Sequence, residues 1–401
     1  MISDPHIFDA STSTPGPAAA AGLARGLKLL AESRQILQEA VGAIARENPA
    51  FVLVPGDLTR DGERSSHELA VSLLARLREA GIPVYVVPGN HDVLNPKAAR
   101  FLEEAEEPVE SVTPEAFAAL YAGFGYDGAL SREPGTLSYA AEPVPGLRLL
   151  ALDTCRYREN GNVPIPAGRL APSTRAWAEG VLRDARSAGA EVIAMLHHGI
   201  MEHFRGEKTW FGQYVVEDFD AVSALLARGG VRVAFTGHGH AQDITLRSFP
   251  SRGDFIFDVE TGSLGSWPDP WRIVEVDGAG RMRVRSRFVT SIPDHPADFP
   301  GDSEGRLREG LFAIAGSLFE RLQVTGESGR ILAGQLADAM KPFFRGDERA
   351  ARTDFFLEGV GPWGAAVAGL ARQTLRDLQT DLSPPDNDVM LDLADGSWRG
   401  P

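Results

Sequence analysis

The chain has 401 residues, of which 43% are hydrophobic, so it is long enough for one large domain and a smaller appendage. The formal net charge of −15 argues against a broad nucleic-acid surface, because binding a duplex generally needs a basic patch. Cys155 is the single cysteine, which excludes an intrachain disulfide framework. The sequence also lacks an apolar run of about eighteen residues, so we expect no transmembrane segment.

The first part of the chain alternates between helical and strand-like patterns. Apolar spacing predicts helices over residues 23–46, 65–79, 172–187 and 217–228. Apolar runs predict strands over residues 51–54, 84–87, 147–152, 192–196 and 231–235. This β-α-β alternation is typical of an α/β core.

After residue 240 the pattern changes to short strands separated by hairpin-type breaks such as Asp277-Gly278. These strands are expected over residues 244–249, 255–259, 272–276 and 282–289, and they indicate a largely antiparallel second sheet. A proline-containing linker follows from Ile292 to Gly301. Beyond it, apolar residues at helical spacing predict helices over residues 304–323, 329–344 and 360–378.

We therefore predict an α/β fold, a four-layer α-β-β-α sandwich of two mixed sheets flanked by helices, with a C-terminal helical region. The expected division is a domain over residues 1–292 and a helical region over residues 304–401.

Six of the nine histidines lie in short clusters, and all clusters but the first follow an apolar run. The clusters are Asp4-Pro5-His6, Gly56-Asp57, Gly89-Asn90-His91-Asp92, His197-His198 and Gly237-His238-Gly239-His240. Residues at the carboxyl ends of strands in one sheet converge in space. Any one cluster also fits an ordinary turn after a strand, but five with compatible ligand chemistry argue for a common site.

The residue types in these clusters suit metal ions. Carboxylate, amide oxygen and neutral imidazole form a ligand set for manganese, iron or zinc. Two cations about 3.5–4 Å apart can clamp the attacking and leaving oxygens of a phosphoryl displacement. Asp57 is the expected bridge between them, because it follows Gly56, which allows a close approach of backbone and metal.

The clusters together resemble the calcineurin-like metallophosphoesterases, whose pattern is Asp-x-His, Gly-Asp-x-x, Gly-Asn-His-Asp/Glu, His and Gly-His-x-His. The resemblance implies one metal site formed by Asp4, His6, Asp57 and His240. It implies a second site formed by Asp57, Asn90, His197 and His238. It also implies catalytic roles for Asn90, His91 and Asp92, with His91 facing the phosphate and paired with Asp92.

Shorter strings resemble bacterial cyclic-nucleotide-type phosphodiesterases that carry a C-terminal helical extension. They are Ser3 to Phe8, Thr261 to Leu264 and Trp267-Pro268. The implied function is hydrolysis of a small-molecule phosphodiester, with a 3',5'-cyclic nucleotide as one candidate, by attack of a metal-bound hydroxide. A phosphomonoesterase and a catalytically inactive metal-binding scaffold are the alternatives, and the intact ligand set argues against the second of these.

The N-terminus departs from the family pattern. Family members have a full apolar strand before Asp-x-His, whereas here Met1 and Ile2 alone precede Ser3. Either the sheet tolerates a short strand or the natural coding region starts upstream. The location is therefore cytoplasmic for the chain as given, or exported if a leader precedes it.

Some polar residues near these clusters have two possible roles. His198 either supports a ligand or packs in the core, and Asp153 and Asp243 either support ligand histidines or serve at a strand end or turn. The loops over residues 156–168 and 203–214 are candidates for shaping the pocket.

Overall fold

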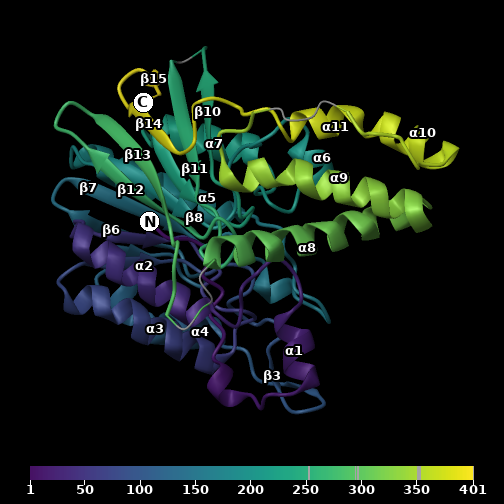
Figure 1. Ribbon diagram of the computed structural model, residues 1–401. Helices are drawn as coiled ribbons and strands as arrows, with labels where there is room; N and C mark the ends of the chain where they lie inside the picture. The colour runs from purple at the N-terminus through teal and green to yellow at the C-terminus, as the bar shows by residue number, and fades with distance from the viewer. Residues whose placement is uncertain (252, 294, 296–297, 350–353, 401) are drawn as a thin grey trace.

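The computed structural model describes residues 1–251, 253–293, 295, 298–349 and 354–400 (Figure 1). It shows two β layers packed face to face, helices outside them and a helical tail projecting to one side (Figure 1). Within the described ranges, every helix is too short or too polar to span a lipid bilayer.

The larger β layer contains seven strands among the described residues, in the spatial order β10-β11-β9-β8-β7-β6-β5. The central strands β7, β8, β9 and β11 pair in parallel, and the outer strands pair antiparallel. Parallel strands end at one common edge, which is where the histidine clusters emerge. The strands are β5 (Ser131–Arg132), β6 (Tyr139–Val144), β7 (Leu147–Leu152), β8 (Glu191–Leu196), β9 (Val233–Thr236), β10 (Asp243–Phe249) and β11 (Asp254–Glu260).

The second layer joins a parallel pair of strands to an antiparallel group through the N-terminus. Its strands are β1 (Val52–Val54), β2 (Val84–Val86), β12 (Pro270–Val276), β13 (Arg281–Phe288), β14 (Asp388–Asp392) and β15 (Trp398–Arg399). Ile2 donates its N–H to the carbonyl oxygen of Leu53 at 3.2 Å, and Arg272 donates to that of Met1 at 2.9 Å. The short segment before Asp4 thus lies between β1 and β12.

Burial on both faces of the central strands explains their continuous apolar sequence. On β7, Leu149 and Ala151 pack into the core between the two layers, which the helices α2 and α3 also line. The alternate residues Leu150 and Leu152 pack on the opposite side, against α5 and α7. This arrangement confirms the predicted α/β sandwich of sheets flanked by helices.

The flanking helices are α2 (Ser33–Glu47), α3 (Arg64–Glu79), α4 (Pro114–Leu120), α5 (Pro172–Ser187), α6 (Glu207–Phe211) and α7 (Phe219–Arg228). Short helical turns and a small hairpin complete the core: η1 (Ala10–Thr12), η2 (Ala122–Tyr126), η3 (Tyr157–Glu159), β3 (Ala99–Phe101) and β4 (Glu106–Pro108).

The predicted helix over residues 23–46 is wrong in its first part. Helix α1 (Pro17–Leu23) ends where that helix was expected to begin, and α2 starts at Ser33. Gly26 lies between them with a left-handed backbone (φ 76°), which a continuous helix does not allow. The residues between α1 and α2 therefore form a loop.

The predicted antiparallel second sheet after residue 240 is correct for β12 and β13 but wrong for β10 and β11. Strands β10 and β11 extend the seven-stranded layer, because β11 pairs in parallel with β9. Strands β12 and β13 lie in the other layer, where β13 pairs with β14 near the end of the chain. The alternating pattern identified the strands but not their partners, which are distant in sequence.

The tail differs from its prediction at both ends. Helix α8 (Phe299–Arg321) starts before the expected Glu304, since Asp298 caps it by accepting from the Gly301 N–H and Pro300 lies in its first turn. Part of the expected linker, residues 294 and 296–297, lies outside the described residues. The tail continues with α9 (Gly326–Arg345), α10 (Pro362–Leu370) and α11 (Arg372–Asp377). The single helix expected over residues 360–378 is therefore two helices. The tail then ends in the strands β14 and β15 and not in a helix.

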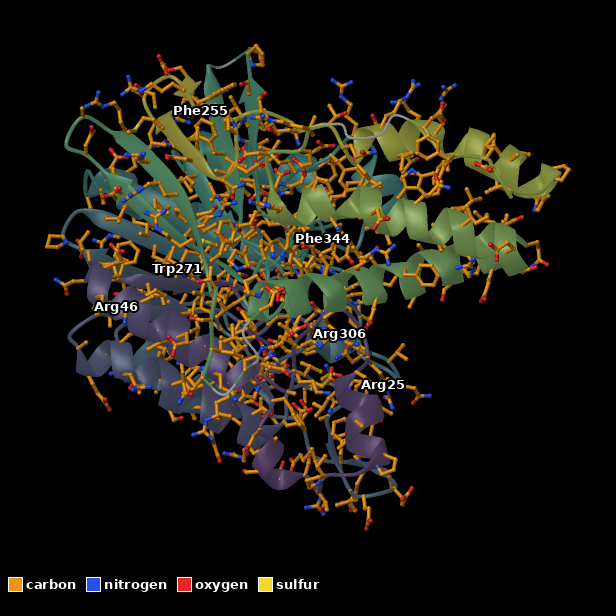
Figure 2. All side chains as sticks on the ribbon, viewed as in Figure 1. Arg25, Arg46, Phe255, Trp271, Arg306 and Phe344 are labelled. Carbon is orange, nitrogen blue, oxygen red and sulfur yellow. The ribbon has the colours of Figure 1, made fainter. Side chains whose placement is uncertain are left out.

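The tail packs against loops of the core. Helices α8 and α9 lie side by side (Figure 1), and Phe344 lies where α9 meets the core (Figure 2). It belongs to a buried apolar cluster with Leu307 of α8 and with Phe204 and Ala241 of the core. The division at residues 292 and 304 stays a prediction.

Candidate metal centre

Ligand-type residues at the strand ends share an unusual backbone conformation. Asp4, His6, Asp57, His238 and His240 all have positive φ angles, from 43° to 71°. Such conformations are uncommon for residues other than glycine and tend to cluster at functional sites. Their concentration at one edge of the sheets indicates a site rather than a series of ordinary turns.

One group of buried or nearly buried side chains contains Asp4, His6, Asp57 and His240, whose ligand atoms lie within 4.8 Å of one another. The Nε2 atoms of His6 and His240 are 3.2 Å apart, and His240 Nε2 lies 3.4 Å from Asp4 Oδ1. Among the described residues, Asp4 Oδ1 has no hydrogen-bond partner although it is buried. Burial lowers the pKa of both histidines, so their neutral rings are free to bind a cation.

A second group contains Asp57, His197 and His238, again within 4.8 Å. His197 Nδ1 donates to the carbonyl oxygen of Pro55 at 2.8 Å, which directs Nε2 toward Asn90 Oδ1 at 3.1 Å. Burial disfavours a charged His197, but attraction to Asp57 outweighs it and raises the pKa to about 9.

Asp57 belongs to both groups. Its Oδ2 lies 3.5 Å from His6 Nε2, and its Oδ1 lies 3.4 Å from His197 Nε2. Gly56 makes this placement possible, because its φ is 101° and an added Cβ would lie 2.7 Å from His197 Nδ1. The structure therefore brings together every residue expected for the two metal sites, with Asp57 between them, and the donor set fits two cations.

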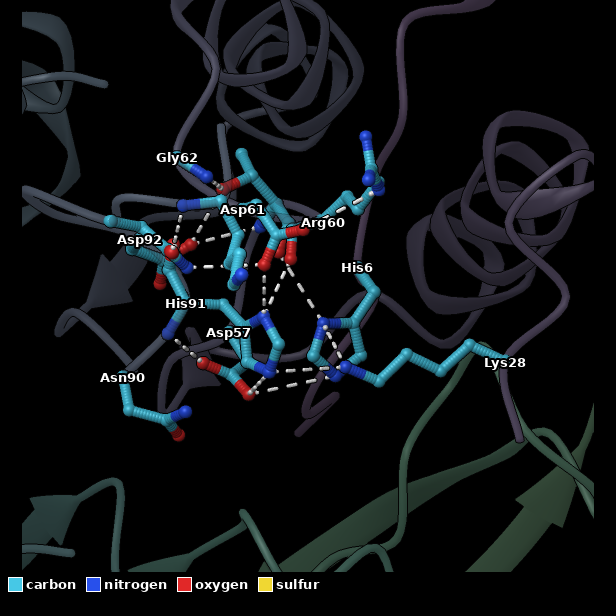
Figure 3. A network of polar contacts seen from close by, with 12 residues as sticks. His6, Lys28, Asp57, Arg60, Asp61, Gly62, Asn90, His91 and Asp92 are labelled. Carbon is cyan, nitrogen blue, oxygen red and sulfur yellow. Dashed lines mark hydrogen bonds and ion pairs between the residues drawn. The ribbon is translucent and has the colours of Figure 1, made fainter. Parts of the chain in front are cut away.

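His91 lies beside these groups, and its partner is not the predicted one. Its Nδ1 lies 2.6 Å from the carbonyl oxygen of Arg60 and 2.9 Å from Asp61 Oδ1. Its Nε2 lies 4.0 Å from Asp57 Oδ2, and the side chain is 26% exposed. This geometry places His91 Nε2 beside both the Asp57 carboxylate and Lys28 Nζ (Figure 3).

The predicted pairing of His91 with Asp92 is wrong. The Asp92 carboxylate is buried and accepts hydrogen bonds from the backbone N–H groups of Leu58, Thr59 and Gly89 at 2.8–3.0 Å. These bonds hold two of the ligand-bearing loops together. Asp92 therefore binds backbone N–H groups of two loops, whereas a contact with the His91 ring was expected.

Two residues near the site were missed in the sequence. Lys28 extends from the loop before α2 and places Nζ 3.1 Å from His6 Nδ1 and 3.3 Å from His91 Nε2 (Figure 3). Asp61, the partner of His91, was the other. Lys28 was hidden in a stretch predicted as helix, whereas Asp61 follows the Gly56-Asp57 block closely enough to have been considered.

The residues with two possible roles are now placed. The centroid of the His198 ring lies 4.4 Å from that of His238, with the rings tilted by 60°, and His198 Nε2 donates to the carbonyl oxygen of Pro166, so it both packs and supports a ligand. Asp153 accepts from the Tyr157 hydroxyl at 2.8 Å, which is a role within its own turn. Asp243 accepts from Nδ1 of His203 at 2.7 Å, and this histidine lies outside both ligand groups.

One candidate loop contacts a ligand, and the other contacts the residue that packs on that ligand. The loop over residues 156–168 contacts His198 through Pro166. The loop over residues 203–214 places the carbonyl oxygen of Gln213 3.1 Å from His238 Nε2 and the Tyr214 ring 5.1 Å from the His238 ring. They therefore border the site, as expected for segments that shape a pocket.

The fold and the site together define a metal-dependent hydrolase of the α/β sandwich class. The sequence model of the calcineurin-like phosphoesterases matches residues 1–242, which is more than half of the chain. The chain belongs to the calcineurin-like phosphoesterase family. Members of this family hydrolyse phosphoester bonds at a binuclear metal centre, and the two ligand groups that share Asp57 agree with this.

Comparison with solved structures gives distant likenesses. A dimetal phosphatase from Danio rerio has 16% identity and a TM-score of 0.48, with 72% of this chain and 94% of that one covered. A purple acid phosphatase from yellow lupin (Lupinus luteus) seeds has 11% identity and a TM-score of 0.43, with 72% and 50% covered. A search of curated proteins gives no match.

Proposed function

We propose that this protein is a binuclear metal-dependent phosphodiesterase acting on a small molecule, with a 3',5'-cyclic nucleotide as the first candidate substrate. The observation that carries the proposal is the shared Asp57 carboxylate, with His91 beside it and Lys28 beside His91. Manganese, iron or zinc would each suit the oxygen and imidazole donors.

The metal ligands would be Asp4, His6, Asp57 and His240 for one ion, and Asp57, Asn90, His197 and His238 for the other. When bound, the two ions would supply an activated water and neutralise charge on the phosphate. The residues of the chain would do the rest by orienting the substrate and by moving a proton.

His91 is the proposed general acid. Asp61 accepts from Nδ1 and so fixes the ring, and the doubly protonated ring would donate its Nε2 proton to the departing alkoxide oxygen and become neutral. Lys28 would attract a non-bridging phosphate oxygen, since its ammonium lies 3.3 Å from His91 Nε2. The amide oxygen of Asn90 would bind a metal ion, and its N–H group would donate to a phosphate oxygen.

The charge near the site favours a diester over a monoester. The guanidinium of Arg60 is close by, but it is held in ion pairs with Asp61, Glu63 and Glu106 at 3.0–3.4 Å. Lys28 therefore supplies the main positive charge from the chain. One ammonium beside two metals suits the single negative charge of a diester better than the double charge of a monoester.

The test compares substrates that differ in this charge. Purified protein with Mn²⁺ should release p-nitrophenol from bis-p-nitrophenyl phosphate faster than from p-nitrophenyl phosphate, and should hydrolyse a cyclic nucleotide. A preference for the monoester would identify a phosphomonoesterase instead. Release no greater than a metal-only blank from every substrate would identify a binding scaffold and contradict the proposal.

A further inference from the structure

A second set of carboxylates lies where the C-terminal tail returns to the sheets. Asp243 begins β10, Asp347 and Glu348 follow α9, Asp381 follows α11, and Asp386 precedes β14. Their oxygens form two overlapping groups, each within 4.8 Å, that share Asp386. Segments far apart in sequence thus converge on one acidic cluster, defined by these residues.

Unpaired oxygens distinguish this cluster from an ordinary acidic surface. Glu348 is only 8% exposed, and within the described part of the chain neither of its carboxylate oxygens has a hydrogen-bond partner. Asp381 Oδ1 is in the same state. Burying an unpaired carboxylate is costly, and its cost falls when the group binds a proton or a cation.

The raised pKa values of two carboxyl groups agree with the absence of a positive partner among the described residues. Burial, together with the negative charge of Asp243, raises the pKa of Glu348 to about 9. Burial and the same neighbour raise the pKa of Asp381 to about 7.

Of two nearby cationic groups, Arg272 contacts backbone carbonyl oxygens, and His203 pairs with one member of the cluster, Asp243. Arg272 is buried and donates to the backbone carbonyl oxygens of Asp386 and Glu260, not to their carboxylates. His203 donates from Nδ1 to Asp243, and its Nε2 faces the Glu260 carboxylate at 3.3 Å. Each of these two groups thus has contacts of its own, and the cluster keeps an excess of negative charge.

The frame around the cluster is held by backbone hydrogen bonds. Asp386 accepts from the N–H of Ile244 at 2.8 Å and from that of Asp347 at 2.5 Å, and its own N–H donates to Asp347 Oδ1 at 2.9 Å. Gly346 has a φ of 81°, and an added Cβ would lie 2.9 Å from Asp386 Cβ. The loop after α9 is therefore clasped closely to the segment before β14.

We propose that the acidic cluster is a third cation site, which binds Ca²⁺ and fastens the C-terminal tail to β10. All of its candidate donors are oxygens, and Ca²⁺ takes six to eight oxygen ligands in flexible geometry. Mg²⁺ demands a regular octahedron and keeps several waters, while Zn²⁺ prefers nitrogen or sulfur ligands. The site is separate from the proposed catalytic centre, so its role is to stabilise the fold.

The first test measures Ca²⁺ uptake. Four full-length proteins are compared: wild type, Glu348→Gln, Asp381→Asn and Glu358→Gln. Each is saturated with Mn²⁺ at the proposed catalytic centre, freed of other metals and then dialysed against Ca²⁺. Glu358 is exposed and provides the matched loss of one carboxylate. Wild type and Glu358→Gln should bind one Ca²⁺ per chain, and the other two variants should bind it at least about tenfold more weakly.

The second test measures stability. Millimolar Ca²⁺ should raise the midpoint of thermal unfolding of wild type and Glu358→Gln by about 4 °C or more, and that of Glu348→Gln much less. Asp381→Asn serves in place of Glu348→Gln if the latter fails to fold. No Ca²⁺ uptake by wild type, or equal responses of Glu348→Gln and Glu358→Gln, would overturn the site, and an equal effect of Mg²⁺ would overturn its assignment to Ca²⁺. Neither test depends on phosphodiesterase activity.

Discussion

His91 and Asp61 form a hydrogen-bonded pair in which the imidazole Nδ1 lies 2.9 Å from the carboxylate Oδ1. The carbonyl oxygen of Arg60 lies 2.6 Å from the same nitrogen. Two acceptors keep a proton on Nδ1, so the proposed general-acid role requires a second proton on Nε2, which faces Asp57. Because the ring is oriented without a metal, its proposed role can be separated from metal binding.

Replacing His91 with alanine should therefore lower turnover but spare the metals. We expect His91→Ala to reduce kcat for an activated diester by about 10²–10⁴, the usual range for loss of an acid–base group. Asp61→Asn should reduce kcat less, since the ring remains but is held less firmly. Steady-state kinetics and elemental analysis check this, with Asp127→Asn at an exposed position as the control. Loss of metal in His91→Ala would make His91 a ligand instead.

The tail is predicted to position Lys28 through α8. Gly310 of α8 packs against the loop that carries Lys28, and an added Cβ would lie 2.5 Å from Leu27 Cδ2 and 2.7 Å from the carbonyl oxygen of Gly26. Lys28→Gln should raise KM for the diester about tenfold, because the proposed phosphate contact is lost. Gly310→Ala should displace the loop that carries Lys28 and therefore also raise KM. Metal content should not change in either variant.

Gly316 offers a matched control on the same helix. An added Cβ there meets no heavy atom within 4 Å, so Gly316→Ala should leave KM unchanged and slightly stabilise α8. Equal kinetic effects of Gly310→Ala and Gly316→Ala would show that the contact with Leu27 does not influence the site. An unchanged KM in Lys28→Gln would remove the proposed phosphate contact.

Asp269 should make the fold less stable as pH rises. This residue is buried, accepts from the Ser303 hydroxyl of α8 at 2.7 Å, and has its pKa raised by burial to about 8. Between about pH 4 and 8 the folded state keeps a proton that the unfolded state loses, so this contribution to stability declines across that range. Asparagine mimics the protonated acid and tolerates the left-handed backbone (φ 55°).

Asp269→Asn should therefore gain about 1 kcal/mol or more over wild type in the free energy of unfolding at pH 8, with a smaller gain at pH 5. Denaturant unfolding at both values measures this difference, with Asp127→Asn as the charge-matched surface control. A gain that does not change between the two pH values would contradict a raised pKa at Asp269.

The sequence allowed the ligand set to be predicted because the ligands have distinctive side chains in short clusters, and all clusters but the first follow a recognisable strand. Asp4, His6, Asp57, His197 and His240 all fall in such clusters, and the structure brings them together. The parallel core strands were predictable for the same reason, since buried strands have continuous apolar runs.

Contacts between distant segments could not be predicted in this way. Lys28 lies in a stretch whose leucine spacing suggested a helix, and Asp61 competes with Asp92 as an equally plausible acidic partner for His91. The pairing of β11 with β9 and of β14 with β13 depends on long-range packing, which one sequence does not encode locally.

The central claim, that Asp57 is shared by two cations, is tested most directly by the metal content of Asp57→Asn. An amide cannot supply the shared negative charge, so wild type and Asp127→Asn should hold two ions per chain by elemental analysis, and Asp57→Asn should lose more than one of them together with its activity. An Asp57→Asn protein that keeps two tightly bound metals and normal turnover would contradict the account.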